Sequence, residues 1–152
     1  MPYHLAQYNI AWLAEPFESA LYDDFREALD RINRLAEAAP GFVWRHQTED
    51  GNSTGVRVRD DDRILINFSV WEDVESLFNY TYRSGHVELF RKRTKWFSHE
   101  DTPYAVLWWI PAGTTPAVHE AEQRLALLKA AGPTAEAFTF KSRFPPPATD
   151  SL

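Results

Sequence analysis

The sequence predicts an α+β fold with the element order βαββαβ, followed by an extra helix and an extended tail. Segments of alternating apolar and polar residues are interleaved with segments whose apolar residues recur at helical spacing. Two strand-like segments follow one another with only a polar, turn-rich stretch between them. At 152 residues and 44% hydrophobic content, the chain is long enough for one domain with a sizeable core. We expect that domain over 1–144 and a Pro-rich, disordered tail over 145–152.

The first three elements are a strand, a helix and a strand. Residues 3–10 alternate as a strand does, and Ser19 is the expected N-cap of a long helix that ends at Pro40 and Gly41. The apolar stripe of this helix consists of Leu21, Phe25, Leu29, Ile32 and Leu35. Residues 42–47 predict the second strand, with one face formed by Phe42, Trp44 and His46.

A polar loop over 48–62 leads to the clearest strand, residues 63–71. One face of this strand is apolar throughout and consists of Ile64, Ile66, Phe68 and Val70. The other face is mixed and consists of Leu65, Asn67, Ser69 and Trp71. A helix capped by Asp73 follows, is expected to break at Ser84-Gly85, and restarts at His86.

Residues 104–110 predict a fourth strand, apolar on both faces. Thr115 is the expected cap of the extra helix, with Pro116 in its first position and Gly132 at its end. Its stripe is Val118, Ala121, Leu125 and Leu128, and an aromatic extended segment follows over 138–144.

This order corresponds to a ferredoxin-like arrangement, with two helices on one face of an antiparallel sheet. The apolar side of the 63–71 strand is unsuited to water, so something must cover it. Either that side or its opposite packs under the helices, and the remaining side needs a partner. A second copy of the chain, packed sheet against sheet, is the simplest cover, so we predict a homodimer.

Composition excludes several classes of function. The net charge of −6 argues against binding nucleic acid, and the absence of Cys excludes disulfides and thiolate ligands. No metal-binding His spacing, phosphate loop or nucleophile elbow occurs, so we expect neither a metal nor an organic cofactor. The first residues lack a basic region followed by an apolar run, and no stretch approaches a membrane span. We therefore expect a cytoplasmic protein.

The segment from Asn67 to Phe97 reads NFSVWEDVESLFNYTYRSGHVELFRKRTKWF and is followed by PYAVLWWIPAG and GPTAEAFTF. These motifs resemble those of a bacterial family described as a domain of unknown function. The order of elements, with Trp-Glu ending the third strand and Ser-x-His in the following helix, resembles the dimeric α+β barrel superfamily. That superfamily includes antibiotic-biosynthesis monooxygenases and haem-degrading monooxygenases.

The resemblance implies roles for three residues. Cofactor-independent members use an Asn and a Trp four residues apart on one strand, which is similar to Asn67 and Trp71. Both lie on one strand face and can reach one site, where Asn67 would polarise a substrate oxygen and Trp71 would offer a stacking wall. Haem-degrading members place an axial His where His86 stands. His86 could instead move a proton, or it could tie the helix break together by bonding a nearby carbonyl.

The aromatic content of six Trp, six Tyr and ten Phe supplies further candidates for a site. Those that we expect to bind a substrate are Trp71, Tyr80, Tyr82, Trp96, Trp12 and Trp108. The plainer interpretation of the Trp residues is that they fill the core or an interface.

Three functions stay open at this stage. The first is an enzyme without a cofactor that acts on a flat aromatic or polyketide-like substrate, with Asn67 and His86 as catalytic residues. The second is a non-catalytic dimeric module that binds an apolar metabolite. The third is a haem-binding protein. Shared architecture does not choose among them.

Overall fold

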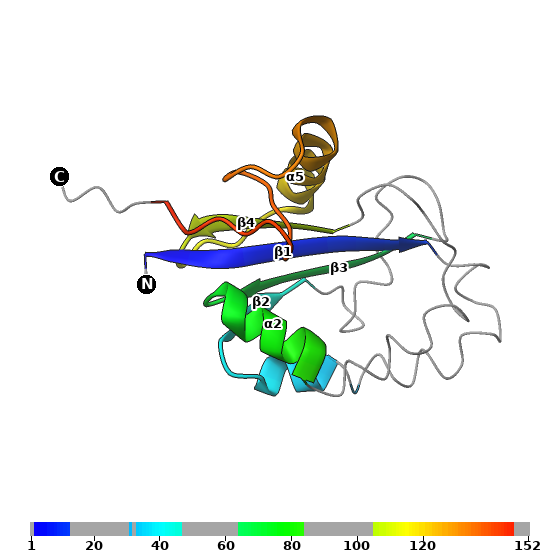
Figure 1. Cartoon of the computed structure of the whole chain (residues 1–152). Helices are drawn as coiled ribbons and strands as arrows, with labels where there is room; N and C mark the ends of the chain where they lie inside the picture. Colours follow the sequence, from blue (N-terminus) through cyan, green and yellow to red (C-terminus); the bar gives the residue numbers. More distant parts are fainter. Residues whose placement is uncertain (1, 13–30, 32, 47–63, 84–104, 148–152) are drawn as a thin grey trace.

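The structure is a computed structural model, and it describes residues 2–12, 31, 33–46, 64–83 and 105–147. Its centre is a four-stranded antiparallel sheet with the strand order β2-β3-β1-β4 (Figure 1). The strands are β1 (Tyr3–Trp12), β2 (Phe42–Arg45), β3 (Ile64–Trp71) and β4 (Ala105–Pro111). The helices are α2 (Val74–Arg83) and α5 (Val118–Ala131), and residues 33–38 are also helical. This order confirms the predicted ferredoxin-like sheet.

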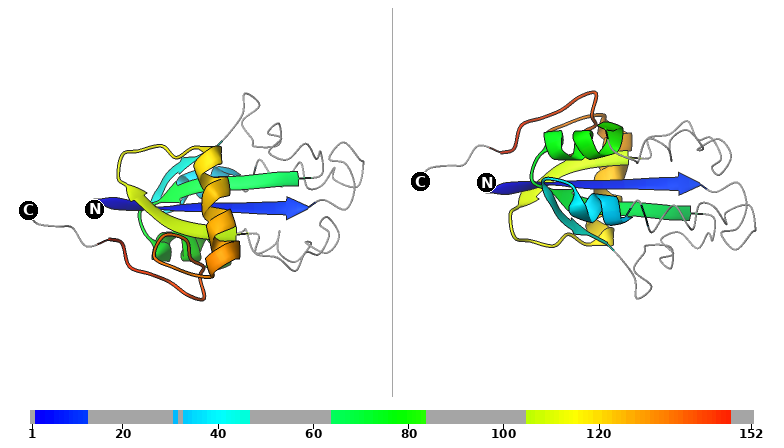
Figure 2. Two further views of the ribbon diagram at one scale, coloured as in Figure 1. Left: turned by 90° about the horizontal axis from the view of Figure 1, so that it is seen from above. Right: turned by 90° about the horizontal axis from the view of Figure 1, so that it is seen from below.

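The register between β1 and β3 decides which side chains share a face of the sheet. Leu5 lies opposite Trp71, Gln7 opposite Ser69, and Asn9 opposite Asn67. Because side chains alternate along a strand, these six point to one face and their neighbours point to the other. Helix α2 packs on the first of these faces, which we call the α2 face, and α5 packs on the opposite one, the α5 face (Figure 2).

The α5 face holds the larger core cluster. Ala121, Leu125 and Leu128 form the predicted stripe of α5 and are buried against the sheet. The sheet residues that they cover, directly or through their neighbours, are Ala6, Tyr8, Ile10, Ile66, Phe68, Val70, Val106, Trp108 and Ile110. Ile66, Phe68 and Val70 are only 3%, 2% and 1% exposed. A single chain therefore buries this apolar face under α5. An uncovered sheet face no longer supports the homodimer, which stays a prediction.

The α2 face holds the second cluster, in which Trp71 and Leu5 pack beneath α2 and residues 33–38. Leu77 of α2 and Ala36 are the buried helical members of this cluster. Asp73 caps α2 as predicted, because its Oδ1 accepts hydrogen bonds from the Ser76 backbone N–H at 2.8 Å and from Ser76 Oγ at 2.7 Å. The expected helix break at Ser84-Gly85 lies outside the described residues.

Two predicted details of the elements are wrong. We expected Phe42 and Trp44 on one face of β2, but an irregularity in register falls between them. Phe42 consequently packs with Trp71 on the α2 face, whereas Trp44 packs with Phe68 on the α5 face. The second error concerns α5, which begins at Val118 rather than after Thr115. Ala117 has extended backbone geometry and no side chain caps the helix.

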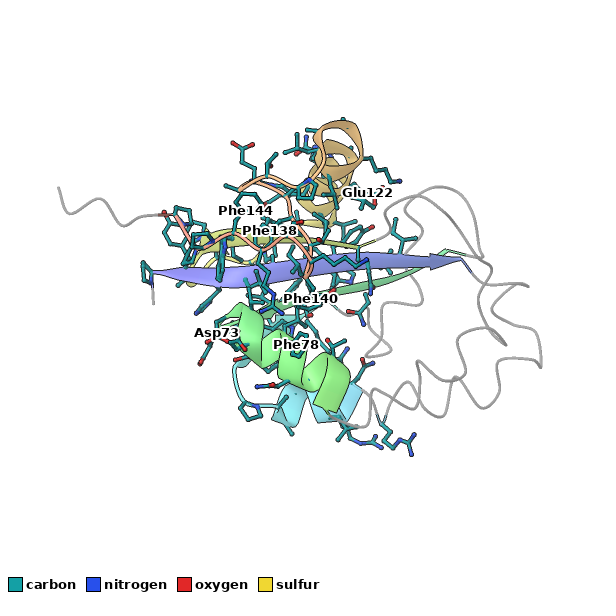
Figure 3. The ribbon with its side chains drawn as sticks, viewed as in Figure 1. Asp73, Phe78, Glu122, Phe138, Phe140 and Phe144 are labelled. Atoms are coloured by element: carbon teal, nitrogen blue, oxygen red, sulfur yellow. The ribbon has the colours of Figure 1, made fainter. Side chains whose placement is uncertain are left out.

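The segment after α5 runs along the free edge of β4. The backbone groups of Phe138 and Leu107 exchange two hydrogen bonds of 2.8 Å, so this segment continues the sheet for one residue pair. Phe140 then contacts Phe78 of α2, with ring centroids 5.8 Å apart (Figure 3). Further along, the Phe144 carbonyl accepts a hydrogen bond from Trp109 Nε1 at 2.9 Å. The predicted extended aromatic segment thus joins β4 to α2.

Candidate functional site

The α2 face carries a row of polar side chains on its two central strands. Gln7 and Asn9 come from β1, and Asn67 and Ser69 come from β3. Gln7 and Ser69 are buried, Asn9 is half-buried, and Asn67 is exposed. We call these four residues the polar row. A polar row in the middle of a sheet is unusual, because buried amides and hydroxyls must find partners to offset their lost hydration.

Hydrogen bonds between side chains link the polar row to Trp71. Trp71 Nε1 donates to Ser69 Oγ at 2.8 Å, and Gln7 Nε2 donates to the same oxygen at 2.9 Å. Gln7 Nε2 also donates to Asn67 Oδ1. The partner of the Asn67 side chain among the described residues is thus Gln7, on the neighbouring strand.

Three aromatic rings adjoin this network. Trp71 stacks against Tyr80 of α2, with centroids 5.1 Å apart and an interplanar angle of 27°. The edge-to-face partner of Trp71 is Phe42, at 5.5 Å. Trp71 itself is 1% exposed, so its ring supports Tyr80 from within the core and does not offer a free wall to a ligand. Tyr80 and Phe42, the two rings that contact Trp71, are half-buried.

A positively charged side chain, Arg45, lies next to Ser69 on the neighbouring strand. Arg45 of β2 pairs with Ser69 in register, and its Nε lies 3.4 Å from Glu37 Oε2. Burial raises the pKa of the Tyr80 phenol well above its usual range, and the positive charge of Arg45 opposes this shift. Tyr80 is therefore a neutral hydrogen-bonding group at physiological pH, not a proton shuttle.

The structure brings together some of the predicted site residues and separates others. Asn67, Trp71 and Tyr80 lie on the α2 face, as a shared site requires. Trp108 lies on the α5 face, is fully buried, and donates from Nε1 to Glu120 Oε2 at 3.0 Å. Its interpretation as a core residue is therefore preferred to substrate binding.

The remaining predicted site residues cannot be placed. His86 and Trp96 lie outside the described residues. Trp12 ends β1 and Tyr82 lies in α2, but their side chains are not among those described. Their proposed contacts with a substrate stay predictions.

Sequence reasoning missed Gln7, Asn9 and the part of Ser69 as the acceptor that links Gln7 to Trp71. The signal was present in the alternation of β1, where Gln7 and Asn9 occupy successive positions of one strand face between Leu5 and Ala11. Two polar residues at this spacing in a central strand indicate a face that is not a plain core.

The polar row can donate and accept hydrogen bonds but holds no evident metal site. In the described part of the chain, no group of three or more His, Asp or Glu side chains is placed to bind a metal ion. The helices described are also too short or too polar to cross a membrane.

The fold and the polar row together define an α+β protein with a ferredoxin-like sheet and a polar row on its α2 face. The chain belongs to the DUF3291 family, described as a domain of unknown function, whose model matches residues 4–152. This confirms the family resemblance seen in the sequence. No curated protein matches the chain.

Two solved structures resemble the chain. SnoaB, a cofactor-independent oxygenase from Streptomyces nogalater, is 17% identical, with 74% of this chain and 95% of that chain covered and a TM-score of 0.48. PA3566 from Pseudomonas aeruginosa is 12% identical, with 73% and 95% covered and a TM-score of 0.48. Neither similarity assigns an activity to this chain.

Proposed function

We propose that the protein is an enzyme that binds a flat aromatic or polyketide-like molecule over the polar row and transforms it without a metal or organic cofactor. Monooxygenation, cyclisation and isomerisation are the reactions that the superfamily resemblance suggests. The observation that carries the proposal is the exposed amide of Asn67, whose Oδ1 accepts a hydrogen bond from Gln7 on the sheet face that α2 and Tyr80 cover.

The chemistry follows from what a fixed amide does. A hydrogen-bond donor that is already oriented stabilises negative charge as it develops on a substrate oxygen, for instance during enolate formation. Tyr80, backed by Trp71, offers an aromatic surface against which a planar ring can pack. If the reaction is an oxygenation, dioxygen is the oxidant and receives its electrons from the deprotonated substrate carbon. His86 is our candidate for removing that proton.

Turnover of phenols and aromatic polyketides by purified variants tests this proposal. Asn67→Ala and His86→Ala should each lose most of the activity while their unfolding curves stay close to that of the wild type. Asn79→Ala is the matched control, because Asn79 is an exposed amide on α2. Full activity in Asn67→Ala would remove the polar row from the reaction.

A second candidate function is a non-catalytic module that captures an apolar metabolite. One observation favours it. The four residues of the polar row carry no titratable side chain, and burial raises the pKa of the Tyr80 phenol, which keeps it protonated near neutral pH. This module would bind the same planar molecules without converting them, and His86→Gln would leave their affinity unchanged.

Haem binding through His86 is the third candidate and needs its own measurement. A hemin titration should then give a Soret shift in the wild type that His86→Ala abolishes. A shift of the same size in both proteins would exclude His86 as the axial ligand.

A further inference from the structure

The orientation of the Asn67 amide determines what the polar row can recognise. One end of a side-chain amide donates hydrogen bonds and the other accepts them, so the end that faces outward selects ligands of the opposite kind. The side chain of Asn67 is exposed, whereas the Gln7 side chain that holds it is in a residue only 8% exposed. The orientation is therefore decided by Gln7.

Gln7 turns its side-chain nitrogen toward Asn67 because the backbone carbonyl oxygen of Asn67 is an acceptor in a fixed position. Its Nε2 lies 3.4 Å from the backbone carbonyl oxygen of Asn67, in addition to its bonds to Asn67 Oδ1 and to Ser69 Oγ. A backbone carbonyl can only accept and cannot turn over within a strand. With the Gln7 amide reversed, two carbonyl oxygens would face each other. The N–H end of Gln7 must consequently point at Asn67.

The other end of the network is equally constrained. The indole N–H of Trp71 can only donate, and it donates to Ser69 Oγ at 2.8 Å. Ser69 Oγ accepts this bond and the one from Gln7. Ser69 and Trp71 are 7% and 1% exposed, so the network is anchored in the core rather than at the surface.

We propose that Gln7 is a positioning residue, which turns the Asn67 amide so that its NH₂ group faces the ligand. The site then selects planar molecules that carry an acceptor oxygen, such as a ketone, an enolate or a phenolate, over molecules of the same shape that carry a donor. In the described part of the chain no residue accepts a hydrogen bond from Asn67 Nδ2, so none of the described residues competes with a ligand for this group. The inference rests on the proposed function in that it takes the polar row as the ligand site.

Two variants separate this role from a merely structural one. In Gln7→Glu, residue 7 can only accept once its carboxyl group is ionised, and burial beside the Asn67 carbonyl raises the pH that ionisation needs, so this variant is measured from about pH 6 to about pH 10 and compared at the alkaline end. Asn67 should then turn its NH₂ inward and its carbonyl outward. Gln7→Leu removes the hydrogen bonds altogether and should leave the amide without a preferred orientation. Gln123→Glu introduces the same charge at an exposed position of α5 and serves as the control.

Three planar probes of one shape report the orientation. 9-Fluorenone carries an acceptor, carbazole carries a donor, and fluorene carries neither. The wild type and Gln123→Glu should bind 9-fluorenone about fivefold more tightly than carbazole, which corresponds to roughly 1 kcal/mol for one net hydrogen bond. The ratio should invert in Gln7→Glu and approach one in Gln7→Leu. Equal affinities of the wild type for all three probes, or a ratio that Gln7→Glu leaves unchanged, would overturn the selection.

Hydrogen exchange of the side-chain amides, followed by NMR without any ligand, tests the orientation separately. We expect slow exchange for the Gln7 NH₂ and fast exchange for the Asn67 NH₂ in the wild type, with the Asn67 NH₂ becoming protected in Gln7→Glu. A protected Asn67 NH₂ in the wild type would overturn the inference. If the exchange pattern is as expected but none of the probes binds, the positioning by Gln7 stands and the proposed function fails.

Discussion

Gly41 occupies a position in the structure that no other residue can fill without rearrangement. Its φ of 84° lies in the left-handed region that favours glycine, and its carbonyl oxygen accepts a hydrogen bond from the Glu72 backbone N–H at 2.8 Å. A Cβ at this position would overlap the side chain of Ser76 at the start of α2. The turn before β2 can therefore approach the start of α2 this closely only because residue 41 has no side chain.

We expect Gly41→Ala to lower the free energy of unfolding by about 3 kcal/mol, because backbone strain and overlap with Ser76 act together. Gly113→Ala is the control, since Gly113 has a φ of 88° but no atom within 4 Å of an added Cβ. Strain alone should cost it about 1 kcal/mol. Equal losses in urea unfolding of the two variants would show that the contact with Ser76 is unimportant.

His46 makes the stability of the fold depend on pH. Its ring stacks on Phe68, with centroids 6.2 Å apart and an interplanar angle of 16°, and burial lowers its pKa below the ordinary 6.5. The folded state thus prefers the neutral ring. The stability that the neutral His46 ring contributes is fully present above pH 6.5. It is lost as the pH falls through the lowered pKa, because the unfolded state then binds the proton more readily than the folded state does.

Urea unfolding at about pH 7.5 and about pH 5 measures this contribution. The wild type and His119→Gln should lose more stability between the two pH values than His46→Gln does. His119 is an exposed residue of α5, so its replacement controls for the loss of a histidine. Identical losses in all three proteins would show that the burial of His46 does not contribute.

Among the helices and strands, the features that neighbouring residues determine could be predicted from the sequence, and those that distant residues determine could not. The strand over Ile64–Trp71, the Asp73 cap and the α5 stripe were predicted because each is written in neighbouring residues. The irregularity in β2 was not, because it depends on how Phe42 and Trp44 pair with β3. Nor does the stripe of α5 indicate which face of the sheet it covers.

The candidate site was predictable in part for the same reason. Asn67 and Trp71 were identified because they resemble an Asn and a Trp that cofactor-independent members of the superfamily carry four residues apart on one strand. Gln7 was not recognised, because its hydrogen bond to Asn67 joins residues 60 positions apart in the sequence. Whether an Asn is a ligand group or a satisfied core amide depends on such distant partners, and no local pattern contains them.

The segment after α5 behaves as an element of the fold even though it is neither a helix nor a strand. The rings of Phe140 and of Phe78 in α2 contact one another and the guanidinium of Arg143, whose Cζ is 5.7 Å from the Phe140 centroid and 5.2 Å from the Phe78 centroid. Removing the Phe140 ring should weaken the attachment of the segment to α2. We expect Phe140→Ala to lower the free energy of unfolding by about 2 kcal/mol, since the ring is half-buried.

Lys141→Ala is the control for this element, because Lys141 is an exposed neighbour in the same segment. Its effect should stay within about 0.5 kcal/mol of the wild type. Thermal or urea unfolding of both variants measures the difference. A loss no larger in Phe140→Ala than in Lys141→Ala would show that the contact with α2 adds nothing to the stability.

For the whole molecule, the burial of the α5 face limits which surface could form the interface of a homodimer. Ile66, Phe68 and Val70 are at most 3% exposed in a single chain, so folding does not require a second sheet on this face. A protein whose folding depends on a partner subunit becomes more stable as its concentration rises. The concentration dependence of unfolding therefore shows whether unfolding is linked to the dissociation of subunits.

We expect the urea midpoint of the wild type to be the same from roughly 1 to 100 µM protein. Leu125→Ala in α5 should lower the free energy of unfolding by about 3 kcal/mol at every concentration, because Leu125 is fully buried against the sheet. Light scattering in the same buffer gives the mass, either 17.6 kDa or twice that value. A midpoint that rises with concentration would show that the subunits fold together. A doubled mass with a constant midpoint would show that a dimer forms but dissociates before its chains unfold.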